Sequence, residues 1–293
     1  MNSMPPYTLF GVEDCDYERS RVVVVPVPYD SMTSYKPGTR DGPFAIIEAS
    51  RAIEWFDREV RFNPSEYGVF TTEELAPDFQ SPEKMAERVE REISQVLSDG
   101  KMPLMLGGDH SISIGAIRAA AKKGELSVLH FDAHSDSRES YMGSRYSHAC
   151  TMARAREVAK SCYSVGVRST DRESAERYSK ENLYMEQVRE LPAREAAERI
   201  LANLGENIYL TVDLDVLDPS EMPSTGTPEP GGMRYTYLRE VLRAVISKRK
   251  VVGMDFVELS PIPGLVAPNY LAAKLIFSVL GYLSEAEGGK GVQ

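Results

Sequence analysis

Three short stretches of the sequence place aspartate, in two of them together with histidine, within or directly after apolar or glycine-containing runs. Residues 107–110 read GGDH, residues 130–136 read HFDAHSD and residues 213–215 read DLD. Carboxylates that are packed together repel one another, whereas two divalent cations would supply four positive charges and make the cluster favourable. Carboxylate and imidazole ligands without thiolate suit Mn²⁺ better than a structural zinc site. The candidate ligands are Asp109, His110, Asp132, His134, Asp136, Asp213 and Asp215.

A pair of ions in such a cluster predicts hydrolytic chemistry. Two-metal hydrolases hold their ions about 3.5 Å apart, and the water between them becomes acidic enough to act as a nucleophile near neutral pH. Within the second and third stretches the charged residues recur at a spacing of two, so in extended chain they would share one side. Taken singly, each stretch has a simpler interpretation as a turn or a hydrogen-bonded core histidine. The combination favours the metal site, because all four histidines lie between positions 110 and 148.

The elements that must position these residues are short strands that alternate with helices. The apolar runs are continuous, which is typical of strands covered on both faces. The alternation predicts an α/β fold with a mostly parallel central sheet between helices, formed as one domain over residues 1–293. Such sheets bind ligands beyond the carboxyl ends of their strands, where the aspartates and histidines lie. We expect strands within residues 21–30, 102–110, 126–134, 161–169, 207–215 and 250–259, and helices within residues 81–100, 191–205, 236–250 and 269–289.

The helix expected at residues 81–100 has the clearest signals. Ser81 can cap its first turn, Pro82 suits the first helical position, and Gly100 can end it. Its apolar side chains recur at the helical period and form one stripe. That stripe consists of Met85, Val89, Ile93 and Val96.

Two long segments without a periodic pattern, residues 62–80 and 218–233, are expected to be ordered loops. Long loops in a compact domain often carry function. The second segment is rich in proline and glycine, and its glycines would permit a tight path of the backbone.

The bulk composition excludes several classes of function. The formal charge of −10 and the pI of about 5.1 argue against a nucleic-acid partner, because phosphate contacts need clustered Lys and Arg. An acidic surface also favours a small cationic substrate. We expect no signal peptide and no membrane partner, since no stretch reaches the roughly 18 apolar residues of a membrane span. The three cysteines, Cys15, Cys150 and Cys162, cannot all pair, which predicts a reducing, cytoplasmic environment.

Four motifs resemble those of the ureohydrolase (arginase–agmatinase) family. They are GGDHSIS at 107–113, DAHSD at 132–136, YSHAC at 146–150 and DLDVLDPSEMPSTGTPEPGG at 213–232. Residues 28–51 also resemble the family's amino-terminal segment, and the motifs match in order and separation over nearly the whole chain. The resemblance implies the arginase-type three-layer α/β/α fold, a binuclear centre with two Mn²⁺ per subunit, and a homo-oligomer (trimer or hexamer). It also implies hydrolysis of a guanidino group to urea and an amine.

The resemblance assigns a role to six of the candidate ligands and none to Asp109. Asp132 and Asp213 would bridge the two manganese ions. The hydroxide between the ions would donate a hydrogen bond to Asp136 and attack the guanidinium carbon. One ion would be bound by His110, Asp132, Asp136 and Asp213, and the other by Asp132, His134, Asp213 and Asp215.

The resemblance also places side chains around the substrate. His148 falls where the family keeps a histidine that shuttles protons at the mouth of the site, with a structural role as the alternative. Glu258 matches the glutamate that holds the guanidinium, and Thr227 corresponds to a loop position near it. His130 has no ligand role in the family and is interpreted as supporting a ligand or packing in the core. Asp255 is interpreted as structural.

The segment before His148 carries the signal for the substrate. Residues 137–147 contain Tyr141 and Tyr146 and no asparagine, so they resemble agmatinases, which release putrescine and urea, more than arginases. Arg138 and Arg145 keep other substrates open, because either could bind a carboxylate. Those substrates are arginine, 4-guanidinobutyrate and formiminoglutamate.

Two other classes of protein remain as alternatives. A zinc deacetylase on the same general fold would show paired adjacent histidines, and the sequence has no His-His pair. A non-catalytic, metal-binding family member is the second alternative. Every ligand position of the family pattern is filled, which argues against loss of the site.

Overall fold

An eight-stranded sheet runs through the centre of the computed structural model, which describes residues 6–13 and 16–288. The strand order is β2-β1-β3-β8-β7-β4-β5-β6, and every pairing between the described strands is parallel. The predicted α/β class is thereby confirmed. Cys15 lies outside the described residues. The strands are β1 (Val22–Val27), β2 (Val69–Thr71), β3 (Met102–Gly107), β4 (Ser127–Phe131), β5 (Ser161–Val165), β6 (Asn182–Leu183), β7 (Asn207–Asp213) and β8 (Lys250–Val257).

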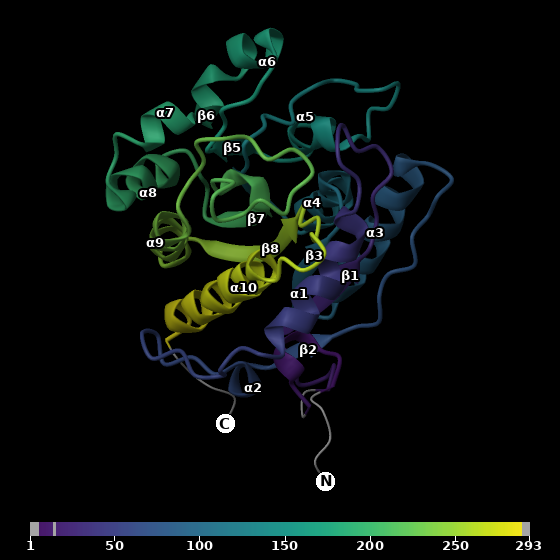
Figure 1. Ribbon diagram of the computed structural model, residues 1–293, viewed down its shortest axis with the longest axis vertical. Helices are drawn as coiled ribbons and strands as arrows, with labels where there is room; N and C mark the ends of the chain where they lie inside the picture. The colour runs from purple at the N-terminus through teal and green to yellow at the C-terminus, as the bar shows by residue number, and fades with distance from the viewer. Residues whose placement is uncertain (1–5, 14–15, 289–293) are drawn as a thin grey trace.

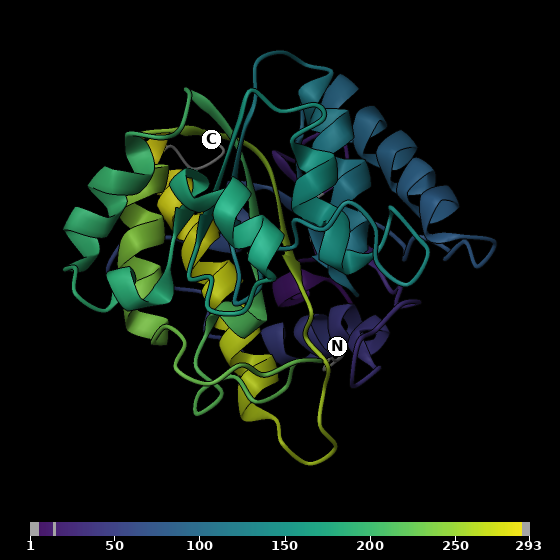
Figure 2. The ribbon, with the colours of Figure 1, turned by 90° about the horizontal axis from the view of Figure 1, so that it is seen from above.

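Helices cover both faces of the sheet (Figure 1). One face packs against α3 (Pro82–Ser98), α4 (Ser113–Ala121) and α5 (Thr151–Ala155). The other face packs against α1 (Gly42–Ser50), α8 (Ala193–Leu201), α9 (Tyr235–Ile246) and α10 (Ala267–Ala286). Figure 2 shows the two layers on opposite sides, blue and teal helices against green and yellow ones. The predicted three-layer α/β/α arrangement is confirmed. The shorter helices are α2 (Pro64–Tyr67), α6 (Arg172–Arg177) and α7 (Met185–Val188).

Alternate residues of the central strands contact different helical layers. In β4, Leu129 and Phe131 pack into the core formed with α1, α8, α9 and α10, whereas Val128 packs into the core formed with α3, α4 and α5. All three side chains are fully buried. This two-sided burial is the physical reason that the strands read as continuous apolar runs.

Helix α3 forms as its sequence signals predict. The Ser81 hydroxyl accepts a hydrogen bond from the backbone N–H of Lys84 (3.1 Å), and Pro82 occupies the first turn. The helix ends at Ser98, shortly before Gly100, whose φ of +73° suits glycine. The predicted apolar stripe is buried, and Ala86 joins it.

The segment 62–80, predicted to be a loop, contains α2 and β2. Asn63 accepts a hydrogen bond from the backbone N–H of Ser65 (3.0 Å), and Pro64 follows it, so a single helical turn forms. The edge strands β2 and β6 have three and two residues. Elements this short show no periodicity, which explains why the prediction lacks them.

The predicted strands run past the observed strand ends beside the site. β4 ends at Phe131 and β7 ends at Asp213, so His134 and Asp215 lie in the turns that follow. The prediction that extended chain directs these side chains to one side is therefore wrong. The turns that follow β4 and β7 direct these side chains to one side instead.

The longest described helix, α10, spans Ala267–Ala286 and packs against α1 and α9. It begins two residues before the predicted start at 269, with Pro268 in its first turn, where the missing N–H has no intrahelical acceptor. Across residues 6–13 and 16–288, no helix combines the length and the apolar content that a membrane crossing needs.

Candidate metal centre

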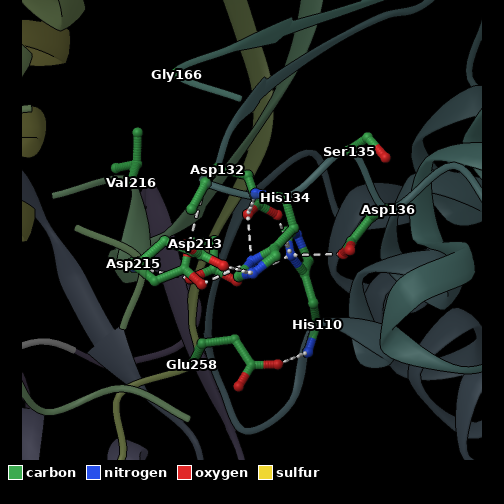
Figure 3. A network of polar contacts seen from close by, with 12 residues as sticks. His110, Asp132, His134, Ser135, Asp136, Gly166, Asp213, Asp215, Val216 and Glu258 are labelled. Carbon is green, nitrogen blue, oxygen red and sulfur yellow. Dashed lines mark hydrogen bonds and ion pairs between the residues drawn. The ribbon is translucent and has the colours of Figure 1, made fainter. Parts of the chain in front are cut away.

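Four adjacent strands, β3, β8, β7 and β4, end at one edge of the sheet, and the candidate ligands lie at or just after the ends of β3, β7 and β4. Figure 3 shows that the carboxylates and imidazoles of the six predicted ligands point toward a common centre. We call these six side chains the floor of the site. They are His110, Asp132, His134, Asp136, Asp213 and Asp215.

Close packing explains the double glycine before His110. A Cβ atom on Gly107 would lie 2.4 Å from Ile112 Cδ1 and 2.6 Å from Val257 Cγ1. A Cβ atom on Gly108 would lie 1.8 Å from the carbonyl oxygen of Tyr29, so no side chain fits there. Asp109 then accepts a hydrogen bond from the backbone N–H of Ser31 (2.9 Å). These contacts fix the turn that carries His110 to the end of the sheet.

One group of candidate ligand atoms surrounds Nδ1 of His110. This nitrogen lies 3.2 Å from Asp132 Oδ2, 3.3 Å from Asp213 Oδ2 and 3.4 Å from Asp136 Oδ2. None of the four residues is more than 7% exposed. The structure therefore brings together the four residues that the sequence assigns to one ion.

A second group surrounds Nδ1 of His134. This nitrogen lies 2.9 Å from Asp215 Oδ2 and 3.5 Å from Asp132 Oδ1. Asp132 thus belongs to both groups, with one oxygen facing each imidazole, as a bridging ligand requires. Asp213 reaches the first group through Oδ2, while its Oδ1 accepts the backbone N–H of Asp215 (2.8 Å). Its bridging role stays a prediction.

Asp132 and Asp213 have the same local function in the backbone. Each accepts a hydrogen bond from the N–H two residues later, Asp132 from His134 (2.6 Å) and Asp213 from Asp215 (2.8 Å). Such turns of an aspartate onto its own backbone compete well with strand pairing. These turns direct the Asp132–His134 pair and the Asp213–Asp215 pair into the floor although the chain is no longer extended.

His130 supports a ligand, which agrees with the first of its two interpretations. It lies within 4.8 Å of candidate ligand atoms of His110, Asp132 and Asp136. Both of its ring nitrogens already have partners, however, because Nε2 lies 2.7 Å from Asp132 Oδ2 and Nδ1 lies 3.0 Å from Ser164 Oγ. A ring engaged in this way has no lone pair to offer a metal ion.

The electrostatics of the floor favour cations. Burial, followed by the charge of Asp132, raises the pKa of Asp136 well above its usual range. Burial and the charge of Asp215 do the same to the pKa of Asp213. Burial alone would lower the pKa of His110, but its contacts with Asp132 and Asp213 raise it well above its usual range. Protons and divalent cations therefore compete for the same place, as they do at metal sites.

The donor set fits divalent cations. His110 Nδ1 is buried without a hydrogen-bond partner although it faces carboxylate oxygens. A buried nitrogen of this kind costs free energy unless it binds a cation. Two histidines and four aspartates supply nitrogen and oxygen donors without a thiolate, which excludes the usual structural zinc set.

A cavity of about 270 Å³ opens onto the floor. Its wall includes four residues of the floor: His134, Asp136, Asp213 and Asp215. The structure brings the three predicted substrate-facing residues to the same cavity, and these are His148, Thr227 and Glu258.

Glu258 is held in a strained and desolvated position. Its φ is +66° and that of Asp136 is +45°, so both residues occupy the left-handed region that non-glycine residues rarely adopt. Glu258 Oε1 accepts a hydrogen bond from the backbone N–H of His110 (2.8 Å). Burial, followed by the charge of Asp109, raises the pKa of Glu258 well above its usual range. A cation beside this carboxylate would offset its burial.

Ser34 is a cavity residue that the sequence prediction lacks. Its Oγ lies 2.9 Å from His148 Nε2, and the His148 ring packs edge-on against Tyr141 at 5.7 Å between centroids. Burial lowers the pKa of His148. The resemblance over residues 28–51 marks the segment that holds Ser34, but a loop serine has no charge or periodicity that would single it out.

Arg168 is a second residue that the prediction lacks. Its guanidinium donates hydrogen bonds to the backbone carbonyls of Asp215 (2.7 Å) and Glu229 (2.9 Å). It thereby ties the turn of a floor residue to the loop 218–233, which carries Thr227. An arginine that binds backbone carbonyls needs no acidic partner, so charge pairing in the sequence could not reveal it.

The two arginines before His148 occupy different surroundings. Arg138 lines the cavity, and its Nε lies 3.9 Å from Asp171 Oδ2. Arg145 instead pairs with Glu157 (2.8 Å) and lines a different cavity. Of the two, Arg138 is therefore the one placed to contact a substrate.

Comparison with known proteins decides the class of this site. The model of the arginase family matches residues 20–281. The chain belongs to the arginase family. An N(1)-aminopropylagmatine ureohydrolase of Thermus thermophilus is 40% identical over 276 residues, covering 93% of this chain and 94% of that protein. An agmatinase of Bacillus anthracis is 36% identical over 257 residues, covering 84% and 86%. The crystal structure of agmatine ureohydrolase of Thermoplasma volcanium superimposes with a TM-score of 0.88 at 31% identity, covering 97% and 96%.

Membership of the arginase family confirms three predictions from the sequence. The chain is an agmatinase-like ureohydrolase by resemblance, its fold is of the arginase type, and it is a hydrolase of linear amidine C–N bonds. The zinc deacetylase interpretation loses its basis, because the matched model is that of the arginases.

Proposed function

We propose that this arginase-family protein hydrolyses the guanidino group of agmatine to urea and putrescine. The observation that carries the proposal is the convergence of six carboxylate and imidazole side chains at a cavity lined also by Glu258 and His148. The names of its relatives, agmatinase and aminopropylagmatine ureohydrolase, support a substrate with a guanidino group and a cationic arm.

The floor is proposed to bind two Mn²⁺ per subunit. When bound, the ions would activate a water molecule and stabilise the negative charge that develops during hydrolysis. The four aspartates balance the four positive charges. One ion would be bound by His110, Asp132, Asp136 and Asp213, and the other by Asp132, His134, Asp213 and Asp215.

Glu258 is proposed to bind and orient the guanidinium. The hydrogen bond from His110 N–H fixes Oε1, so the carboxylate keeps one orientation. A Cβ atom on Gly226 would lie 3.7 Å from Oε2, so the glycine leaves space beside this oxygen. A fixed carboxylate at short range gives a planar cation both charge neutralisation and direction. Thr227 follows this glycine and lies on the same wall.

Asp136 and His148 are proposed to move protons. Hydrolysis breaks one C–N bond of the guanidinium, forms one C–O bond, and passes both protons of water to the departing nitrogen. Asp136, on the floor, is placed to relay a proton between water and that nitrogen. His148 Nε2, which contacts Ser34 at the mouth, is placed to exchange protons with solvent.

N(1)-aminopropylagmatine is a second candidate substrate, favoured by the 40% identity to the Thermus enzyme of that name. Its longer cationic arm would pass Arg138 and reach Asp171. Both residues also line an adjoining cavity of about 200 Å³, which offers room for the arm. A guanidino or formimino compound with a carboxylate would instead pair with Arg138.

A panel of substrates tests the proposal. Enzyme loaded with Mn²⁺ is assayed for urea with agmatine, aminopropylagmatine, arginine and 4-guanidinobutyrate, and for formamide with formiminoglutamate. Agmatine is expected to give the highest kcat/KM. Arg138→Gln should preserve or raise kcat/KM for the two cationic substrates and lower it for those with a carboxylate. Failure of every guanidine to release urea would contradict the proposed function.

The remaining expectations stay predictions. They are one domain over residues 1–293, a homo-oligomer (trimer or hexamer), a cytoplasmic location, and no nucleic-acid or membrane partner. Light scattering coupled to size exclusion would give the number of subunits directly.

A further inference from the structure

A row of polar side chains crosses four neighbouring strands beneath the floor. Ser164 of β5 is the register partner of His130 of β4. His130 is also paired with Thr211 of β7, and Thr211 with Asp255 of β8. All four residues are fully buried. Buried polar groups cost free energy unless they are hydrogen-bonded, so the partners of this row determine its role.

One half of the row leads to His110. The Thr211 hydroxyl donates a hydrogen bond to Asp255 Oδ1 (2.6 Å), and the Tyr209 hydroxyl donates one to Asp255 Oδ2 (2.8 Å). Thr211 Oγ1 also lies 2.8 Å from His110 Nε2. Because the single hydroxyl proton of Thr211 points to the carboxylate, its oxygen must accept a hydrogen bond from the Nε2–H of His110.

This direction of donation sets the tautomer of His110. Because Nε2 keeps its proton for Thr211, the proton that a cation displaces from the ring is the one on Nδ1, which then offers its lone pair. Nδ1 is the nitrogen that faces Asp132, Asp136 and Asp213 at 3.2–3.4 Å. The chain from Asp255 through Thr211 therefore presents a ligating lone pair to the floor.

The other half of the row leads to Asp132. His130 Nε2 donates to Asp132 Oδ2 (2.7 Å), and its Nδ1 accepts from the Ser164 hydroxyl (3.0 Å). The same carboxylate oxygen faces His110 Nδ1. Both halves of the row thus act on the group of ligand atoms around His110.

Apolar side chains at these four positions would stabilise the sheet equally well. The register row below, on the same face, pairs Val128 with Cys162 and with Tyr209, and the Tyr209 hydroxyl reaches up to Asp255. On this face the hydrogen-bonded side chains of these strands therefore converge on the row that contacts the ligands. This placement argues for a role in positioning them.

We propose that Ser164, His130, Thr211 and Asp255 form a positioning row that orients His110 and Asp132 and thereby sets the affinity of the centre for divalent cations. The proposal rests on the proposed metal centre but not on the identity of the substrate. It replaces the interpretation of Asp255 as merely structural. Support of metal ligands by hydrogen bonds typically changes metal affinity by about 10–100-fold.

Titration with Mn²⁺ alone tests the row without any substrate. Thr211→Val removes the hydroxyl at constant shape and should weaken Mn²⁺ binding by about 10–100-fold, whereas Thr211→Ser should restore it. Asp255→Asn should weaken binding at least as much, since an amide can donate to Thr211 and reverse the hydrogen bonds. Ser278→Ala, which removes a buried serine hydroxyl of α10, is the matched control and should leave Mn²⁺ affinity unchanged.

The Nε2 proton of His110 gives a second, independent readout. The chain has four histidines, so ¹⁵N-labelled imidazoles give few signals, and His110→Asn assigns one of them. In the metal-free protein the Nε2–H of His110, hydrogen-bonded to Thr211, should exchange slowly with solvent, and it should exchange faster in Thr211→Val and Asp255→Asn. The proposal is overturned if both variants bind Mn²⁺ within about twofold of the control, or if the Nε2–H of His110 exchanges no faster in them. Urea release from agmatine bears on the proposed function alone, so the proposed positioning row and the proposed function can fail separately.

Discussion

The floor of the cavity and its mouth are built on different principles. The floor residues lie at the ends of three strands of one sheet, β3, β4 and β7, and three of the four carboxylates accept a hydrogen bond from a backbone N–H. The mouth, which we define as residues 28–38 and 137–147, consists of loops with exposed side chains such as Tyr35 (80% exposed) and Met142 (61%). The comparison indicates that the sheet specifies the reaction, whereas loops that can vary independently specify the substrate.

The largest expected effect is on the floor, from Asp132→Ala. Asp132 contacts both imidazoles of the centre, so its removal should abolish tight binding of both ions and lower kcat/KM by about 10³-fold or more. His130 would also lose its acceptor. Metal analysis after gel filtration measures the result. Two ions retained per subunit in this variant would count against Asp132 as a bridge.

Glu258→Gln should have the next largest effect. Glutamine keeps an oxygen for the N–H of His110 but loses the charge that pairs with a guanidinium. We expect kcat/KM for agmatine to fall by about 10²–10³-fold, as when one electrostatic contact to the reacting group is removed. Bound Mn²⁺ should stay at the wild-type level. Loss of metal together with activity would show that Glu258 acts through the floor instead.

At the mouth, Asp30→Asn should reduce stability rather than catalysis. Burial alone would raise the pKa of Asp30, but hydrogen bonds from the Arg40 side chain and Gly38 N–H outweigh it and lower this pKa. A lowered folded-state pKa adds stability that is fully present above the unfolded value of about 4 and is lost as the pH falls through the folded value. We expect about 1.5–3 kcal/mol less stability at pH 7.

Urea unfolding in EDTA, at pH 7 and at pH 3, measures the effect of this substitution. The difference between wild type and Asp30→Asn should shrink at the lower pH, which lies below the unfolded pKa of about 4, so that part of the stabilisation is lost. An equal difference at both pH values would mean that the charge of Asp30 contributes nothing.

The smallest effect concerns the two described thiols. Burial raises the pKa of Cys150 to about 11 and that of Cys162 to about 12, so both should alkylate slowly at pH 8. Cys150 follows a mouth loop and Cys162 lies in β5, so local opening should label Cys150 faster. Mass spectrometry in a Cys15→Ser background gives both rates. Faster labelling of Cys162 would mean that β5 opens more readily than the segment that follows the mouth loop.

The sequence predicts the central sheet and the floor because both depend on strong local signals. Continuous β-branched runs such as residues 22–27 indicate two-sided burial, and aspartates and histidines after such runs indicate a site at the strand ends. The family motifs then supply the order of the ligands. The bends after β4 and β7 were not predicted, because a hydrogen bond from Asp132 to the backbone leaves no trace in periodicity.

Long-range partners are what the sequence cannot give. Ser34 meets His148 across 114 positions and Thr211 meets His110 across 101, so neither pair has a local pattern. The same holds for Arg168, whose partners are backbone carbonyls that every residue offers. Thr211 and Asp255 are polar residues inside apolar strands, and the sequence gives no sign that they are partners. The strand register shows that they lie side by side.

The sheet terminates at both borders in strands of only three and two residues, β2 and β6. A border this short offers another chain very few unpaired amide and carbonyl groups, so it resists extension into larger sheets and fibrils. Copies of this protein that associate would therefore meet through side chains of helices and loops. Self-assembly and protection from aggregation can then be adjusted by different parts of the molecule.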